Sequence, residues 1–80
     1  MEAIMRETQI ILRDIDSIRG FVRQVIQVDF EVDLVQGRYL IDAKSIMGIF
    51  ALDTLSPITV VAHTDNADEF FARIDKFIVK

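Results

Sequence analysis

The chain contains no cysteine and only one histidine among its 80 residues. Without cysteine, disulfides and thiolate metal sites are excluded, so the stability has to come from packing. No apolar run approaches the length that spans a bilayer, and the N-terminus has neither a basic flank before a long apolar stretch nor a small-residue cleavage site. We therefore expect a cytoplasmic protein that does not enter the membrane.

Basic residues are also scarce. Nine lysines and arginines stand against thirteen acidic residues, which gives a net charge of −4, and the basic residues are scattered singly along the chain. A phosphate backbone would be repelled unless the fold gathered the arginines on one face, namely Arg6, Arg13, Arg19 and Arg23. The sequence therefore argues against a nucleic-acid partner, and nothing in it indicates a metal or a small-molecule cofactor.

What the chain does have is apolar residues. They make up 51% of the sequence and include six phenylalanines, a composition typical of a packed globule and not of a disordered chain. At this length there is room for one core only. We expect a single domain over residues 1–80.

The spacing of these apolar residues predicts the elements along the chain. Strands are expected at Met5–Leu12, Phe30–Val35, Arg38–Ile41 and Ile58–Ala62. The helix period is carried by Ile18, Phe21, Val22, Val25 and Ile26 in a first helix, by Lys44–Leu52 in a second, and by Phe70, Phe71, Ile74, Phe77 and Ile78 on the buried face of a third that opens at Asp65–Asp68. The residues Asp53–Pro57 break the second helix, and Gln36-Gly37 supplies a tight turn.

Polar residues mark where the first helix begins. Asp14 or Asp16 could cap it, because a carboxylate there accepts hydrogen bonds from free backbone N–H groups. Gly20 weakens the same helix by roughly 1 kcal/mol relative to alanine, which suggests a close packing contact at that position.

The expected order is β, α, β, β, α, β, α. Helices that all cover one face of a sheet leave the other face open, so we predict an α+β fold: an open-faced two-layer β-sandwich with a four-stranded, mainly antiparallel sheet covered on one face by three helices.

The string Lys44-Ser45-Ile46-Met47-Gly48-Ile49, followed by Leu52, resembles HPr, the small phosphocarrier protein of the bacterial sugar phosphotransferase system. Weaker likeness extends over Asp29–Gly37 and over Ala67-Asp68-Glu69 at the last helix. The resemblance implies an HPr-like βαββαβα domain and a link to the proteins of sugar transport.

One departure from the family is decisive for the chemistry. HPr carries its phosphorylated histidine at the start of helix one, followed by Ala, Arg and Pro. The corresponding positions here are Asp14, Ile15, Asp16 and Ser17, so the nucleophile and the basic residue are both missing. A pair of carboxylates would repel an incoming phosphate. The resemblance thus implies a non-catalytic, Crh-like or divergent member with a degenerate active site, and no enzyme.

Two other residues are candidate phosphoacceptors, His63 and Asp14, and each has an alternative interpretation. His63 would need a phosphate cradle of its own; the alternative, which we favour, is a solvated histidine at a strand end. An acyl phosphate on Asp14 would need a nearby cation; the alternative, again favoured, is a helix cap.

Ser45 matches the serine that a dedicated kinase and phosphatase modify in some HPr proteins and in their Crh-like relatives. A phosphate at this position would bond to free N–H groups and favour the dipole of the second helix. The simpler interpretation is that Ser45 only caps that helix.

The residues that match Ile46 and Met47 belong, in the family, to an exposed apolar patch that docks the kinase, the phosphotransfer enzymes and a transcriptional coregulator. Methionine suits such a surface because its flexible side chain adapts to several partners. Phe50 completes the candidate partner-binding set. Helical spacing leads us to expect Ile46 and Met47 to be partly exposed, and to expect buried positions for Ile49, Phe50 and Leu52.

Three hypotheses follow. The first is a regulatory or adaptor protein that acts through Ser45, Ile46 and Met47, and it is the one we choose. The second is a phosphocarrier with a non-standard acceptor. The third is a divergent structural or oligomer-forming domain. We expect protein partners, and a monomer or weak homodimer.

Overall fold

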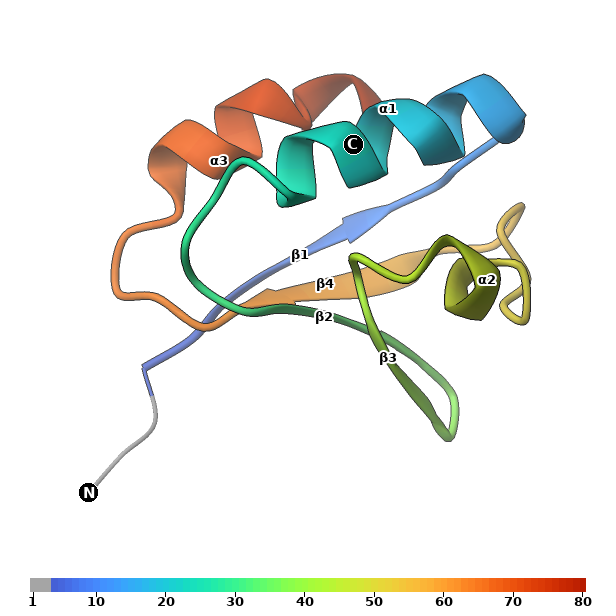
Figure 1. Ribbon diagram of the computed structural model, residues 1–80, viewed down its shortest axis with the longest axis horizontal. Coiled ribbons are helices and arrows are strands. Elements are labelled where there is room, and N and C mark those ends of the chain that lie inside the picture. The colour runs from blue at the N-terminus through green and yellow to red at the C-terminus, as the bar shows by residue number, and fades with distance from the viewer. Residues whose placement is uncertain (1–3) are drawn as a thin grey trace.

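A computed structural model describes residues 4–80 of the chain (Figure 1). Within this range the chain forms four strands, three α-helices and one short 3-10 helix. In chain order they are β1 (Arg6–Ile10), α1 (Ile15–Val25), β2 (Val32–Gln36), β3 (Tyr39–Asp42), α2 (Ile46–Ile49), β4 (Ile58–Ala62), α3 (Asp68–Arg73) and the 3-10 helix η1 (Asp75–Phe77). The α+β fold class that the sequence predicts is confirmed.

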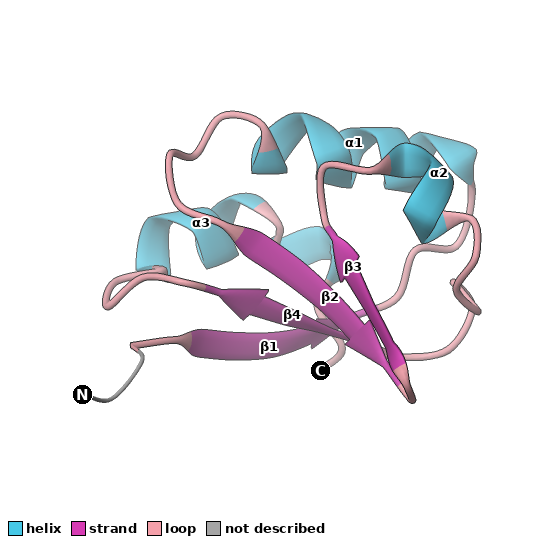
Figure 2. Cartoon of the chain, turned by 60° about the horizontal axis from the view of Figure 1, so that its bottom comes forward, coloured by secondary structure: helices cyan, strands magenta, loops and turns pink. Residues whose placement is uncertain are grey.

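The strands form one sheet in the order β1-β4-β2-β3, and every neighbouring pair is antiparallel. Figure 2 shows α1, α2 and α3 on the same side of this sheet. The opposite side carries no helix within residues 4–80. The expected open, antiparallel sheet covered on one face is therefore present.

The core lies between the sheet and the helices. Alternate residues of β4, namely Ile58, Val60 and Ala62, face the helices and are fully buried. From the helix side, α1 contributes Ile18, Phe21 and Val25 at helix spacing. The ring of Phe21 packs edge-on against Phe77, with centroids 6.2 Å apart. A Cβ added at Gly20 would lie 3.4 Å from the Phe77 ring, so the packing contact predicted at this glycine is confirmed.

The bounds of β1 and β2 differ from those that their apolar runs predict. β1 stops at Ile10 and does not reach Leu12, because the next two N–H groups bond outside the sheet, Ile11 to the carbonyl of Phe77 and Leu12 to that of Thr54. β2 begins at Val32 and not at Phe30, whose ring instead packs edge-on against Phe70 with centroids 5.7 Å apart.

The hairpin turn is shifted by one residue from its predicted position. Its two central residues are Gly37 and Arg38, and the flanking residues Gln36 and Tyr39 are paired. Gly37 has φ of 59°, and no other residue within the described range has a positive φ. Positive φ at the first central position only is the pattern of a type II′ turn, which needs glycine there. Arg38 is thus a turn residue and not the first residue of a strand.

Helix α2 is much shorter than the predicted Lys44–Leu52. Before it, Asp42 forms a turn: its carboxylate accepts from Lys44 N at 2.9 Å and its carbonyl from Ser45 N at 2.9 Å. After it, Ala51 and Leu52 donate to carbonyls three residues back, which is 3-10 and not α geometry. The apolar spacing is present, but local hydrogen bonds limit the helix to one turn.

The last helix is likewise interrupted. Phe70, Ile74 and Phe77 are buried as predicted, but Phe71 and Ile78 are only half-buried. α3 ends at Arg73, η1 follows, and Ile78 then forms an isolated bridge with Ile10 of β1. The end of the chain leaves the helix because it pairs with the edge of the sheet.

Candidate functional site

Ser45 stands at the start of α2, exposed, in an extended backbone conformation. Its Oγ accepts a hydrogen bond from Gly48 N at 3.0 Å, which is the geometry of a helix N-cap. The N–H of Ser45 itself is bonded to Asp42, so the residue is held from both sides. The cap interpretation of Ser45 is confirmed, and its side chain is accessible.

The glycine at position 48 lets α2 approach the sheet. A Cβ built there would lie 2.6 Å from Cγ2 of Ile41 in β3, well inside van der Waals contact. Ile49 is fully buried and Leu52 nearly so, as expected. These contacts anchor one side of α2 in the core and determine which side chains point outward.

Two apolar side chains face solvent here, one within α2 and one at its C-cap. Met47 is 77% exposed and Phe50 is 51% exposed, whereas Ile46 is half-buried against the core. The expectation for Ile46 and Met47 is confirmed, but the prediction that Phe50 is largely buried is wrong. Phe50 follows the single turn of α2 as its C-cap. We call Ser45, Ile46, Met47 and Phe50 the α2 surface.

Figure 1 shows the start of α1, α2 and the 53–57 loop at the same end of the molecule. The loop is tied to this end by the hydrogen bond from Leu12 N to the Thr54 carbonyl, 3.0 Å. Ile15 and Leu55 add two more exposed apolar side chains here, 55% and 69% exposed. This end of the molecule therefore exposes apolar side chains from three separate segments, and Leu55 is the one that the sequence did not mark as a candidate.

The degenerate active-site positions lie at the start of α1. Asp14 is the N-cap, and its Oδ1 accepts from Ser17 N at 2.7 Å. Two hydrogen bonds lower the pKa of Asp14 below its ordinary value: the one from the Ser17 backbone has the larger effect, and the one from the Ser17 side chain has the smaller. Asp16 is exposed in the first turn and Ile15 beside it is also exposed. Of the two predicted candidates, Asp14 is the cap.

A pocket of about 280 Å³ opens beside this helix start. Its lining is Ile11, Arg13, Asp14, Asp16, Ser17, Lys76 and Phe77. Arg13 and Lys76 were not predicted to meet there, because they are far apart in sequence and no periodicity connects them. Two acidic and two basic side chains share this pocket, so it carries no excess of positive charge that would attract a phosphate.

His63 is not the solvated histidine that the sequence analysis favours. Its Nε2 lies 2.7 Å from Oδ2 of Asp33, and both side chains are about one-third exposed. In the register of β2 and β4, Asp33 stands opposite Val61, which makes His63 its diagonal neighbour on the open face. The two residues are 30 positions apart, so only the strand pairing reveals the contact.

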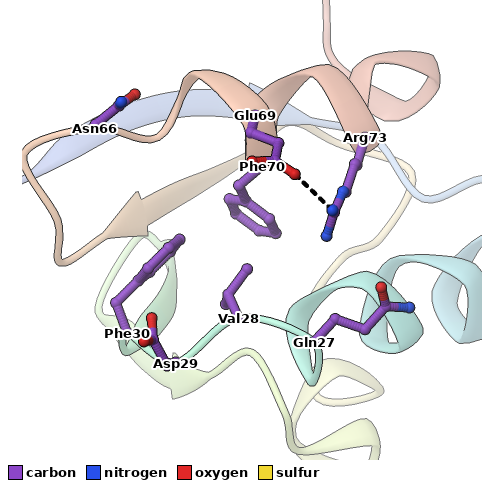
Figure 3. A pocket seen from close by; sticks show the side chains of 8 residues that line it. All are labelled: Gln27, Val28, Asp29, Phe30, Asn66, Glu69, Phe70 and Arg73. Atoms are coloured by element: carbon purple, nitrogen blue, oxygen red, sulfur yellow. Dashed lines mark hydrogen bonds and ion pairs between the residues drawn. The ribbon is translucent and has the colours of Figure 1, made fainter.

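Another pocket, of about 380 Å³, lies away from the α2 surface, between the end of α1 and the start of α3 (Figure 3). Figure 3 shows Phe30, Val28 and Phe70 directed toward one another, with Arg73 bonded to Glu69 at 2.6 Å on the rim. Asn66, Gln27 and Asp29 complete the lining. Arg73 is already paired with Glu69 of its own helix, so within residues 4–80 the one charged side chain of this pocket without an ion pair is Asp29.

Comparison with known protein families and with curated proteins finds no match for this chain. Within residues 4–80, no helix is long and apolar enough to cross a membrane. In the same range, no three histidine, aspartate or glutamate side chains come together in a way that could hold a metal ion. The candidate site therefore rests on the α2 surface and its geometry.

Proposed function

We propose that this protein is a non-catalytic, HPr-like regulatory or adaptor protein of the cytoplasm that binds protein partners through the α2 surface and is regulated by phosphorylation of Ser45. One observation carries the proposal: an accessible serine hydroxyl caps the same one-turn helix that leaves Met47 and its C-cap Phe50 exposed. Large apolar side chains left in solvent next to a modifiable group are typical of an interaction surface.

The start of α1 supports a role without phosphotransfer. In the HPr-like interpretation a histidine would occupy this helix end, and here Asp14 uses its carboxylate to cap the helix. Asp16, two residues further along the chain, adds a second negative charge that repels a phosphoryl donor. The observed order of strands and helices is compatible with the βαββαβα order that the resemblance implies.

Phosphorylation of Ser45 would act on binding and not on folding. The hydroxyl is exposed, so a phosphate meets no core side chain, and its oxygens can still accept the hydrogen bond from Gly48 N. The modification adds about −1.5 to −2 charges next to Met47. That charge would disfavour an apolar partner and would favour one that presents arginine at this position.

The helix dipole contributes less to this switch than the sequence suggests. α2 has four residues in place of the predicted nine, so few aligned peptide groups act on a phosphate at its start. Lys44, exposed beside Ser45, is the nearest cationic residue in sequence. We therefore expect the phosphate to stay solvated and available to a partner.

The docking part of the proposal is tested with the serine kinase and phosphatase of the family as the partner. Met47→Glu places a charge on the α2 surface, and we expect it to lower the rate of Ser45 phosphorylation about tenfold or more, because exposed apolar anchors dominate such interfaces. Ile26→Glu is the matched control. Ile26 is 60% exposed, but it is the C-cap of α1, whereas it is the start of α1 that lies at the same end of the molecule as α2. Equal rates for both variants and the unmodified sequence would refute docking through Met47.

A further inference from the structure

β3 is the last strand of the sheet, and its outer edge is unpaired within residues 4–80. Two of its side chains are strongly exposed: Tyr39 at 52% and Leu40 at 69%. Natural edge strands of this kind are usually protected by lysine, proline or a bulge, because free N–H and C=O groups can pair with another chain. Tyr39–Asp42 contains no lysine, no proline and no bulge, and its one charged residue is Asp42.

The hairpin determines which backbone groups of β3 face outward. Gln36 and Tyr39 flank a two-residue turn and form a hydrogen-bonded pair. Hydrogen-bonded and non-bonded pairs alternate along an antiparallel ladder, so Leu40 and Asp42 are in non-bonded pairs with β2. The bond from Ala43 N to the Val32 carbonyl, 2.9 Å, agrees with this alternation. The N–H and C=O of Leu40 and the N–H of Asp42 therefore point away from the sheet.

Charges at the two ends of β3 are also without partners. Neither Arg38 nor Asp42 forms an ion pair in the described part of the chain. Asp42 stands directly opposite Asp33 in the ladder, and only Asp33 has a counterpart, His63. The carboxylate of Asp42 accepts one bond from Lys44 N but forms no ion pair with a cationic side chain within residues 4–80. Like charges directly opposite are unfavourable, so a cation near Asp42 would relieve this pair.

We propose that the outer edge of β3 pairs with β3 of a second copy of this chain, antiparallel, with Leu40 opposite Leu40 at the two-fold axis. In this register Arg38 of each copy stands opposite Asp42 of the other, and Tyr39 stands opposite Ile41. The Leu40 N–H of each copy then donates to the Leu40 carbonyl of the other copy, and each Asp42 N–H faces the Arg38 carbonyl of the other copy.

The register is specific for a second copy. Shifting it by one pair in either direction places Tyr39 or Ile41 on the axis and separates Arg38 from Asp42, so it loses both charge pairs. In the symmetric register the two charge pairs form simultaneously, and an aromatic residue meets a β-branched one on the helix-covered face. Two four-stranded sheets would join into one of eight strands, with all helices on the same side. The contact is small, so the dimer is expected to be weak and concentration-dependent.

Disulfide trapping tests the register directly, because the chain has no cysteine of its own. In a hydrogen-bonded antiparallel pair the Cα atoms are about 5.5 Å apart, which a disulfide can span. Under mild oxidation we expect Leu40→Cys to give a disulfide-linked dimer, seen by intact mass. Leu55→Cys is the control, since Leu55 is also 69% exposed but lies in a loop. Equal yields from both variants would overturn the proposal.

The second test reverses the charges at positions 38 and 42. Self-association is measured by sedimentation equilibrium from micromolar to millimolar concentration. Arg38→Asp and Asp42→Arg should each weaken self-association about tenfold, because each replaces two attractions by two repulsions. An equimolar mixture of the two variants should recover it, since the introduced aspartate of one chain then faces the introduced arginine of the other. Arg38→Asp changes only an exposed turn residue, so it remains informative if Asp42→Arg folds poorly. A monomer at every concentration, or a dimer that ignores both substitutions, would refute pairing through β3.

Discussion

Two glycines in helices are predicted to respond to alanine in opposite directions. Alanine favours a helix over glycine by up to about 1 kcal/mol at each position. At Gly20 the added methyl would meet the Phe77 ring at 3.4 Å, an ordinary contact, so the gain should be retained. At Gly48 it would meet Cγ2 of Ile41 at 2.6 Å, which the packed core cannot accept without moving.

The magnitudes decide the sign at Gly48. Overpacking of a core typically costs about 1–3 kcal/mol, and a helix of one turn yields only part of the alanine gain. The same methyl would also lie 3.1 Å from Oγ of Ser45 and disturb the cap. We expect Gly48→Ala to lose roughly 1–2 kcal/mol and Gly20→Ala to gain up to about 1 kcal/mol. For a domain of this size each kcal/mol shifts the melting temperature by about 4–8 °C.

The assay is thermal and urea unfolding followed by circular dichroism, completed by a double-mutant cycle. Ile41→Ala removes Cγ2, so Gly48→Ala should cost little or nothing in that background, although Ile41→Ala alone is destabilising. If Gly48→Ala costs the same free energy of unfolding with and without the Ile41 side chain, the steric explanation is wrong. If Gly20→Ala destabilises the protein, the contact with Phe77 is tighter than described.

Three further outcomes are expected. Ser45→Ala should lower the free energy of unfolding by about 1 kcal/mol through loss of the α2 cap, whereas Ser45→Asp should keep most of it, as urea midpoints will show. Phe21→Ala should cost about 3–5 kcal/mol, because the ring is fully buried against Phe77; a loss under about 1 kcal/mol would contradict its central place in the core. The hydrogen bond from the Ser17 backbone lowers the pKa of Asp14. The stability that the ionised Asp14 contributes is therefore present above its ordinary pKa of 3.8, and it is lost as the pH falls through the lower pKa of the folded state. Asp14→Asn should therefore flatten this acid-dependent part of the urea midpoint, and an unchanged pH profile would contradict the assignment of the cap.

Strong periodicity was a reliable guide to structure. The β-branched run Ile58–Ala62 is β4 without a change of boundary, and the spacing of Ile18, Phe21 and Val25 gives the buried face of α1. The same reasoning overestimates the length of α2. The spacing of apolar residues does not reveal the turn formed by Asp42 or the 3-10 hydrogen bonds after Phe50.

The candidate site was predictable only where it depends on nearby residues. The caps formed by Asp14 and Ser45 follow from local hydrogen bonding over three residues. The pairing of His63 with Asp33 depends on how β2 and β4 align, and no local pattern encodes that register. The exposure of Phe50 depends on where α2 ends, which is the least certain property of a short helix.

Phosphorylation of Ser45 is the claim that most directly distinguishes a regulatory protein from a phosphocarrier. Intact-mass spectrometry would follow the protein in two incubations, one with ATP and the HPr serine kinase, the other with phosphoenolpyruvate and the general phosphotransferase enzyme. The proposed function predicts one added phosphate with the kinase, none with the phosphotransferase enzyme, and none in Ser45→Ala. Ser45→Asn, which keeps a capping side chain but has no hydroxyl to phosphorylate, separates loss of the acceptor from loss of the cap. Phosphate transferred from phosphoenolpyruvate, or no added mass in either incubation, would contradict the proposed function.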